Sequence, residues 1–252
     1  MPGEGWGEVV NVSFEDSLLL CYTYIVIYFS TVSKKYPDDN DLSLDNVTLT
    51  VSQGEFVSIV GHSGAGKTTF TKLILAEEKP TAGTVFYQSK NIHHLKHEAL
   101  TQLRKKIGVV FQDFRLLPNK TTYENIAFAM EVAGKTDEEI RRDVPRVLEV
   151  VDLSSKMMHF PHQLSGGEKQ RLSIARAIIN QPELIIADEP TGNLDPVNTY
   201  EVIQILKKIN DLGTTIILTT HNRGVIDFIG KRVVTFEKGK VIRDDEKGKY
   251  IL

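Results

Sequence analysis

The chain has 252 residues, of which 41% are hydrophobic, 25% charged and 8% aromatic, and this composition excludes a collagen, a low-complexity filament and a disordered tail. Its 33 acidic and 30 basic side chains give a net charge of -3, so no excess of positive charge exists to neutralise a phosphate backbone and nucleic acid is not expected as the main partner. The single cysteine, Cys21, excludes an internal disulfide and a multi-cysteine zinc site.

The first feature along the chain is an apolar run over residues 18–29. It is too short for a membrane-spanning helix, which needs about 20 residues. A signal peptide is not expected either, because the first sixteen residues contain acidic side chains and no lysine or arginine. Residues 1–26 match nothing in the pattern that follows.

The elements that follow alternate between short, apolar, β-branched runs and segments with helical spacing of apolar residues. Strands are predicted at residues 47–51, 56–60, 84–88, 107–111, 184–187 and 214–220, helices at 67–76, within 123–151 and at 200–210, and a hairpin at 233–242. Buried strands alternating with helices indicate an α/β architecture with a largely parallel sheet. The helical stretch over residues 123–158 is interpreted as an insertion between two halves of that sheet.

The sequence GHSGAGKT at residues 61–68 matches every fixed position of the phosphate-loop pattern G-x-x-x-x-G-K-[ST]. Glycines allow backbone amides to turn around phosphates, and the helix that follows directs its N-terminal dipole at the anion. Lys67 is expected to reach the β- and γ-phosphates, and the Thr68 hydroxyl to bind Mg²⁺. His62 is expected to contribute only its backbone. The predicted nucleotide contacts here are Gly61, His62, Ser63, Gly64, Ala65, Gly66, Lys67, Thr68 and Thr69.

The apolar strand at residues 184–187 ends in two carboxylates, Asp188 and Glu189. Asp188 stands where a phosphate-loop enzyme needs a carboxylate for its magnesium shell. Glu189 would then lie beside the γ-phosphate and could polarise the attacking water. An Asp-Glu-Pro triplet could simply end a strand, but the phosphate loop earlier in the chain favours the functional interpretation.

The sequence LSGGEKQR at residues 164–171 opens a predicted helix whose first turn exposes amides, and this forms a second site for an anion. An ordinary capped helix with a Gly-Gly turn would have the same sequence pattern. A chain with two phosphate sites cannot satisfy both with one nucleotide unless the fold brings them together.

With these motifs in order, the chain resembles the nucleotide-binding subunits of ATP-binding cassette (ABC) proteins over about residues 27–245. Residues 61–68 are similar to the family's Walker A motif, 184–188 to Walker B, 164–170 to the signature and 193–195 to the D-loop. The resemblance implies that Glu189 is the catalytic glutamate and His221 the switch histidine, and that Thr68, Gln112 and Asp188 hold Mg²⁺. It also implies ATP contacts for Tyr36, which would stack on adenine, and for Gln112, Ser165, Gly166, Gly167 and Asp195.

The resemblance implies a P-loop NTPase fold with a RecA-like core, an antiparallel β subdomain and an inserted α-helical subdomain at about residues 113–163. We therefore expect one ABC domain over residues 27–250. Family members begin shortly before the first strand, which the resemblance places at about residues 27–32. We therefore expect residues 1–26 to be an extension from a misassigned start, with Val26 as the native start. In the family two cassettes pair head-to-tail, so each ATP lies between Walker A of one subunit and the signature of the other. The resemblance thus implies a homodimer that binds ATP and Mg²⁺ and hydrolyses ATP.

Within the family, the sequence VVFQDFRLLP at residues 109–118 is most similar to the group that works in cell division. This implies a four-helix integral membrane partner, a peripheral location on the cytoplasmic face of the cell membrane, and activation of cell-wall hydrolases. The alternatives are the ATPase subunit of a lipoprotein-releasing or macrolide-type exporter and, less favoured, an ABC ATPase without a membrane partner.

Two smaller clusters have open interpretations. Phe114, Leu116 and Leu117 follow Gln112 in a polar turn, and they could either contact a membrane partner or fold back into the core. His93, His94 and His97 lie close together, but carboxylate or cysteine ligands at good spacing are missing around them. We therefore favour a solvated histidine-rich stretch over a metal site.

Overall fold

The computed structural model of the chain describes residues 24–37 and 41–248. Most of the expected extension over residues 1–26 lies outside this part. Its last residues do not: β1 (Ile25–Lys34) begins inside it, and Val26 is buried and accepts a hydrogen bond from the Gln88 amide at 2.7 Å. The boundary expected at residue 26 therefore falls inside the first strand, because the apolar pattern continues into the sheet. Within the described residues, no helix is long and apolar enough to span a bilayer.

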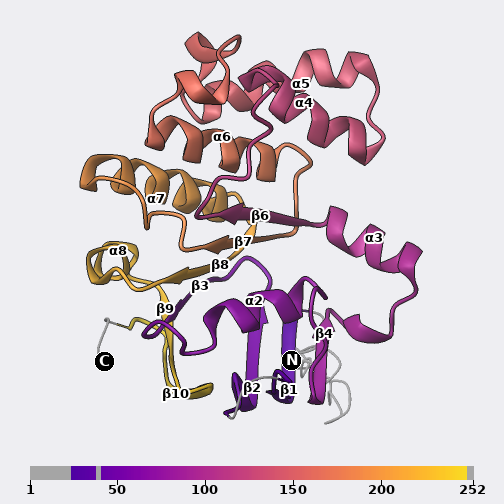
Figure 1. Cartoon of the computed structure of the whole chain (residues 1–252), viewed down its shortest axis with the longest axis vertical. Helices are drawn as coiled ribbons and strands as arrows, with labels where there is room; N and C mark the ends of the chain where they lie inside the picture. Colours follow the sequence, from indigo (N-terminus) through magenta and orange to yellow (C-terminus); the bar gives the residue numbers. More distant parts are fainter. Residues whose placement is uncertain (1–23, 38–40, 249–252) are drawn as a thin grey trace, which may run out of the picture.

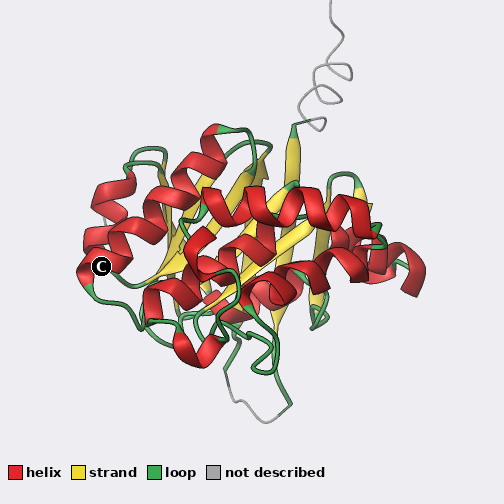
Figure 2. Cartoon of the chain, turned by 90° about the horizontal axis from the view of Figure 1, so that it is seen from above, coloured by secondary structure: helices red, strands yellow, loops and turns green. Residues whose placement is uncertain are grey.

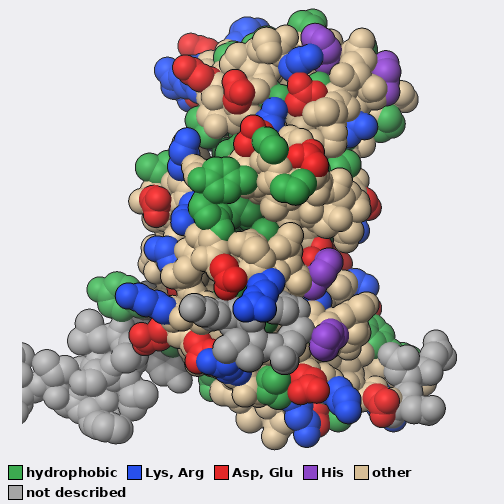
Figure 3. All heavy atoms as spheres, turned by 90° about the vertical axis from the view of Figure 1, so that its left-hand side faces the viewer, with side chains coloured by type: hydrophobic (Ala, Val, Ile, Leu, Met, Phe, Trp, Pro, Cys, Tyr) green, Lys and Arg blue, Asp and Glu red, His purple; other side chains and the backbone are tan. Residues whose placement is uncertain are grey.

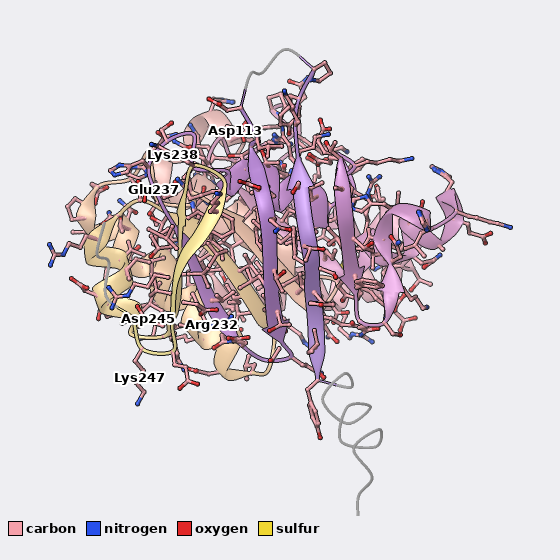
Figure 4. All side chains as sticks on the ribbon, turned by 90° about the horizontal axis from the view of Figure 1, so that it is seen from below. Asp113, Arg232, Glu237, Lys238, Asp245 and Lys247 are labelled. Carbon is pink, nitrogen blue, oxygen red and sulfur yellow. The ribbon has the colours of Figure 1, made fainter. Side chains whose placement is uncertain are left out.

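The centre of the molecule is a six-stranded sheet in the order β10-β9-β3-β8-β7-β6 (Figure 1). Its strands are β3 (Phe56–Val60), β6 (Ile107–Phe111), β7 (Leu184–Asp188), β8 (Thr215–Thr220), β9 (Arg232–Glu237) and β10 (Lys240–Asp245). All neighbours pair in parallel except β10, which forms an antiparallel hairpin with β9. The hairpin turn carries Glu237 and Lys238, with Arg232 and Asp245 at its opposite end (Figure 4). The parallel strands end on the same edge, which is where ligands bind in open α/β sheets.

Alternate residues of the parallel strands enter two different cores, as the period of a strand requires. On one face, residues such as Ile185, Ala187 and Leu218 pack under the helices α6 (Gly166–Ile178), α7 (Pro196–Asp211) and α8 (Arg223–Ile229). On the other face, residues such as Leu184 and Ile186 pack against α2 (Lys67–Ile74) and a second sheet. Helix α2, which follows the phosphate loop, and helix α6, which begins in the segment LSGGEKQR, therefore cover opposite faces of the same sheet.

The second sheet is antiparallel, in the order β2-β1-β4-β5, with β2 (Leu44–Ser52), β4 (Ala82–Tyr87) and β5 (Lys90–Asn91) around β1. Its inner residues pack with α2, where the rings of Phe29 and Phe70 lie 4.5 Å apart. Between β5 and β6 the chain forms a short 3₁₀ turn (Ile92–His94) and α3 (His97–Lys105). The antiparallel sheet thus packs against α2, the helix that follows the phosphate loop.

The helical region contains α4 (Thr122–Ala133) and α5 (Asp137–Val150), which pack against each other and against α6 (Figures 1 and 2). Both helices begin with a capping box, at Thr121 and at Thr136, which satisfies amides that the first turn leaves open. The two ends of the region are joined to each other: the Thr122 amide and hydroxyl donate to the His159 carbonyl at 2.7 and 3.0 Å, and the Tyr123 amide donates to the Met157 carbonyl at 2.9 Å.

The expected fold class is confirmed: an α/β P-loop cassette with a RecA-like core, an antiparallel sheet and an inserted helical region. The predicted elements differ in detail. The helices predicted over residues 123–151 are α4 and α5, and they are separated where Gly134 adopts φ 86° and ends α4. The helices α3 and α8 were missed. Helix α3 buries only Leu103, and α8 buries Val225, Ile226 and Ile229 but is only seven residues long, too short to show a helical period in the sequence.

Candidate functional site

The phosphate loop joins β3 to α2 and requires glycine where neighbouring backbone closes on it. A Cβ atom on Gly61 would lie 2.4 Å from the Phe236 carbonyl oxygen, and one on Gly66 would lie 2.5 Å from the Ser43 carbonyl oxygen. Both residues adopt positive φ, 155° and 106°, which side chains disfavour. Gly66 is the N-cap of α2 and offers no side-chain cap. The first amides of α2 therefore remain available to an anion, as a phosphate cradle requires.

A cavity of about 590 Å³ lies over this loop. The residues that line it come from the phosphate loop, from the ends of β6, β7 and β8, and from the segment before β2. They are Ser43, His62, Ser63, Gly64, Gly66, Lys67, Thr68, Thr69, Gln112, Glu189 and His221. The fold thus brings together Gln112, Glu189 and His221, which are far apart in the sequence, beside the predicted nucleotide contacts. Ser43 is a contact that sequence reasoning missed, since it lies in no motif.

The Lys67 side chain is 9% exposed and points back along its own loop. Its ammonium donates to the carbonyl oxygens of Gly61 at 2.8 Å and His62 at 3.1 Å, and it lies 3.6 Å from Glu189 Oε1. The positive charge is therefore placed between the phosphate cradle and the carboxylate at the end of β7. His62 takes part here through its backbone carbonyl oxygen, and the residue is exposed.

The Glu189 carboxylate contacts both Lys67 and His221 in the cavity. Its Oε2 lies 3.0 Å from His221 Nδ1 and accepts the His221 backbone amide at 3.3 Å. The Glu189 side chain is 17% exposed and that of His221 is 64% exposed. The preceding residue, Asp188, accepts a hydrogen bond at 2.5 Å from the hydroxyl of Thr219 on β8. The two carboxylates thus stand at the sheet edge beside the phosphate loop, where a metal ion and a water could be held.

Gln112 and the predicted D-loop are linked in the same chain. Gln112 Nε2 donates to Asn193 Oδ1 at 3.4 Å, and Asn193 Nδ2 donates to the backbone carbonyl oxygen of Gln112 at 3.4 Å. Asp195 caps α7 by accepting the amides of Val197 and Asn198 at 3.0 and 3.1 Å. Hydrogen bonds from Asn198 hold the pKa of the Asp195 carboxyl below its usual value, so this cap is charged at neutral pH.

The predicted signature residues stand apart from the cavity. Ser165, Gly166 and Gly167 begin α6, and they are not among the described residues that line the cavity. Ser165 Oγ accepts the Glu168 amide at 3.2 Å, and the Ser165 amide donates to Glu168 Oε2 at 2.7 Å. The second of these bonds lowers the pKa of the Glu168 carboxyl. Tyr36 also lies outside the cavity lining; the Lys34 ammonium is 4.8 Å from its ring centre.

The two clusters whose role the sequence did not decide, residues 114–117 and the histidines at 93–97, are partly buried. Phe114, Leu116 and Leu117 are half-buried, and Leu116 packs on the core under the helices, which favours folding back for Leu116. The interpretation of a wholly solvated histidine stretch is wrong for His93, whose ring nitrogens are buried and find no protein partner in the described part of the chain. Burial, with Lys79 nearby, lowers the pKa of His93 to about 4. His94 and His97 are exposed.

Comparisons with known proteins agree with this geometry. The family described as "ABC transporter" matches residues 44–192. The "Cell division ATP-binding protein FtsE" of Bacillus subtilis is 48% identical over 225 residues, covering 89% of this chain and 98% of that protein. The protein of the same name from Mycobacterium tuberculosis is 45% identical over 226 residues, covering 90% and 98%. A solved dimeric structure of the ATP-binding cassette MJ0796 in a post-hydrolysis state with ADP and Pi matches with a TM-score of 0.79 and 36% identity, over 89% of this chain and 100% of that one.

Proposed function

The chain belongs to the ABC transporter family of ATP-binding proteins, and from this premise we propose that it is the ATP-hydrolysing subunit of an FtsE/FtsX-like membrane complex that acts in cell division. The observation that carries the proposal is one cavity in which the phosphate loop, Gln112, Glu189 and His221 meet. The FtsE relatives, which match nearly end to end, support the division role.

The phosphate loop is suited to hold the triphosphate of ATP. The loop residues 62–64 and Gly66 line the cavity together with the N-terminal residues of α2, whose first turn has no side-chain cap, and Lys67 adds a positive charge beside them. Thr68, Gln112 and Asp188 would hold Mg²⁺, since hydroxyl, amide and carboxylate oxygens are ligands of the kind that this ion prefers. When bound, Mg²⁺ neutralises charge on the β- and γ-phosphates.

Glu189 is proposed as the general base and His221 as its partner. A carboxylate that is 17% exposed and faces the cavity can accept a proton from water and orient that water toward the γ-phosphate. The contact of 3.0 Å to His221 fixes the direction of the Glu189 carboxylate, and the contact of 3.6 Å to Lys67 places this carboxylate close to the phosphate-binding charge.

We propose that the active form is a homodimer. Ser165–Gly167 offer a helix N-terminus that does not face the cavity of their own chain, so a second copy can supply it to the ATP held by the first. The face in Figure 3 carries hydrophobic side chains near its middle. Next to the D-loop, an apolar groove of about 350 Å³ contains Leu194, Tyr200, Val225 and Phe228, which supports contact between copies on this side.

A second groove is the proposed contact for an FtsX-like integral membrane protein. It has a volume of about 580 Å³ and lies between α3, β6, α4 and α6. Its rim includes Arg104 and Lys105 and two exposed apolar side chains, Phe128 and Val132, at 40% and 63%. An amphipathic segment with apolar and acidic side chains fits this lining. Binding there would place the chain on the cytoplasmic face of the cell membrane through its partner.

Two experiments test the proposal. The variant Glu189→Gln should bind ATP and accumulate as a dimer in size-exclusion chromatography, with ATP turnover reduced at least tenfold; Glu138→Gln, at an exposed position on α5, is the matched control. Unchanged turnover in Glu189→Gln would exclude this carboxylate as the base. Purification of the tagged full chain from native membranes should recover a four-helix partner. Recovery of a lipoprotein or macrolide exporter subunit would instead support the export alternative.

A further inference from the structure

Thr219 on β8 lies outside every motif found in the sequence, yet it contacts both carboxylate residues at the end of β7. In the parallel pairing of β7 with β8, Asp188 is the register partner of Thr219. The Thr219 hydroxyl donates to Asp188 Oδ1 at 2.5 Å and accepts the Glu189 backbone amide at 3.0 Å. The side chain has no exposed surface. One buried hydroxyl therefore joins the proposed metal ligand to the proposed base.

The direction of each hydrogen bond at Thr219 follows from its partners. A backbone amide can only donate, and an ionised carboxylate can only accept. The hydroxyl must therefore give its single proton to Asp188 and receive the proton of the Glu189 amide. As a result, Oδ1 of Asp188 is held toward β8, which fixes the orientation of the carboxylate at the end of β7.

The contact between the Thr219 hydroxyl and the Glu189 amide matters because the backbone of Glu189 is in an unusual conformation. Glu189 adopts φ 47°, a left-handed conformation that residues other than glycine rarely take. Its amide is held by the Thr219 carbonyl oxygen at 3.1 Å as well as by the hydroxyl. Such a conformation persists only where neighbouring groups determine it. Thr219 thus stabilises the backbone that aims the Glu189 side chain at Lys67 and His221.

We propose that Thr219 is a positioning residue for ATP hydrolysis, which orients the Asp188 carboxylate toward Mg²⁺ and holds Glu189 in its left-handed conformation. The proposal rests on the proposed function of the cavity. A buried threonine could instead serve only to pack the sheet, and Thr215 gives the comparison: it is equally buried at the other end of β8, and its hydroxyl accepts the Gly54 amide at 3.0 Å, far from the carboxylates.

The test compares three variants of the full chain: Thr219→Val, Thr219→Ser and Thr215→Val. The first removes the hydroxyl with little change in volume, the second keeps the hydroxyl, and the third removes a hydroxyl elsewhere in the same strand. The measurements are kcat and KM for ATP, and the affinity for Mn²⁺, as a probe of the Mg²⁺ site, by electron paramagnetic resonance with ADP bound.

For Thr219→Val we expect kcat to fall about tenfold and the Mn²⁺ dissociation constant to rise about threefold, the effect of losing one or two hydrogen bonds to charged or strained groups, with KM nearly unchanged. Thr219→Ser should stay within about twofold of the wild type in both. Thr215→Val should lower the melting temperature and leave kcat and Mn²⁺ affinity unchanged.

The proposal is overturned if Thr219→Val matches the wild type in kcat and Mn²⁺ affinity, or if Thr215→Val loses as much of both. It is also overturned if the serine variant is as impaired as the valine variant, since the hydroxyl would then not matter. Failure of the proposed function gives a different result: the wild type itself would hydrolyse no ATP. The Mn²⁺ comparison would in that case still decide the contact between Thr219 and Asp188.

Discussion

Replacing Asn125 by alanine should destabilise the protein more than any comparable change of a polar side chain on the helical region. Asn125 is fully buried in α4. Its amide nitrogen lies 3.1, 2.9 and 3.0 Å from the carbonyl oxygens of Leu117, Lys120 and Thr121, and its carbonyl oxygen accepts the Leu117 amide at 2.9 Å. This one side chain fastens the segment that follows Gln112 to the first helix of the region.

The size of the effect follows from the donor count. A side-chain amide has two protons and a carbonyl that accepts, so Asn125 makes about three full hydrogen bonds, each worth about 1 kcal/mol net. The free energy of unfolding should fall by about 3 kcal/mol. For a chain of this size that corresponds to a melting temperature lower by roughly 6–12 °C.

The assay is thermal unfolding followed by circular dichroism, with Asn180→Ala as the matched control. Asn180 makes one such bond, to the Ala129 carbonyl at 3.1 Å, so its replacement should cost about 1 kcal/mol, or roughly 2–4 °C. Equal losses in the two variants would refute the reasoning from hydrogen-bond number.

Three further variants test other parts of the structure. Gly61→Ala should abolish binding of a fluorescent ATP analogue, because a Cβ would lie 2.4 Å from the Phe236 carbonyl oxygen; near-normal affinity would contradict the close approach. Ser165→Ala removes the cap of α6 and should cost about 1 kcal/mol in chemical denaturation; it should also weaken ATP-driven dimerisation, and an unchanged dimer would speak against the signature role. His93→Phe should flatten the loss of stability on acidification. Folding lowers the pKa of His93 from its ordinary value of 6.5 to about 4. Between these two values the unfolded chain binds a proton that the folded chain does not, so the contribution of His93 to stability is full above pH 6.5 and falls as the pH drops toward 4. Melting curves across this range should show the shallower slope in the variant, and parallel curves would exclude His93 as the titrating group.

The phosphate loop, the carboxylates at the end of β7 and the α/β alternation could be predicted because they depend on local pattern. The sequence at residues 61–68 fixes its own turn, and a strand such as 184–188 is apolar enough to be recognised alone. The meeting of Gln112, Glu189 and His221 was expected only through the family resemblance, since their proximity depends on the order of β6, β7 and β8 in the sheet.

Contacts that depend on register or on packing between distant segments were beyond the sequence. Thr219 faces Asp188 because of the pairing of two strands, and no spacing in the chain encodes that register. Ser43 reaches the cavity because its carbonyl oxygen packs over Gly66. The burial of His93 arises where a polar-looking segment folds against the second sheet beside Lys79 and Thr84, and hydropathy alone does not indicate it.

The hydrogen bonds that join Thr122 and Tyr123 to His159 and Met157 have a consequence for how this chain can vary. They join the start of the helical region to its end. The distance between these two ends therefore stays the same whatever the length of the chain between Tyr123 and Met157. Because the entropy of closing a loop grows only slowly with length, insertions or deletions between α4 and α5 cost little stability. The length of this connection can therefore change while the six-stranded sheet stays unchanged.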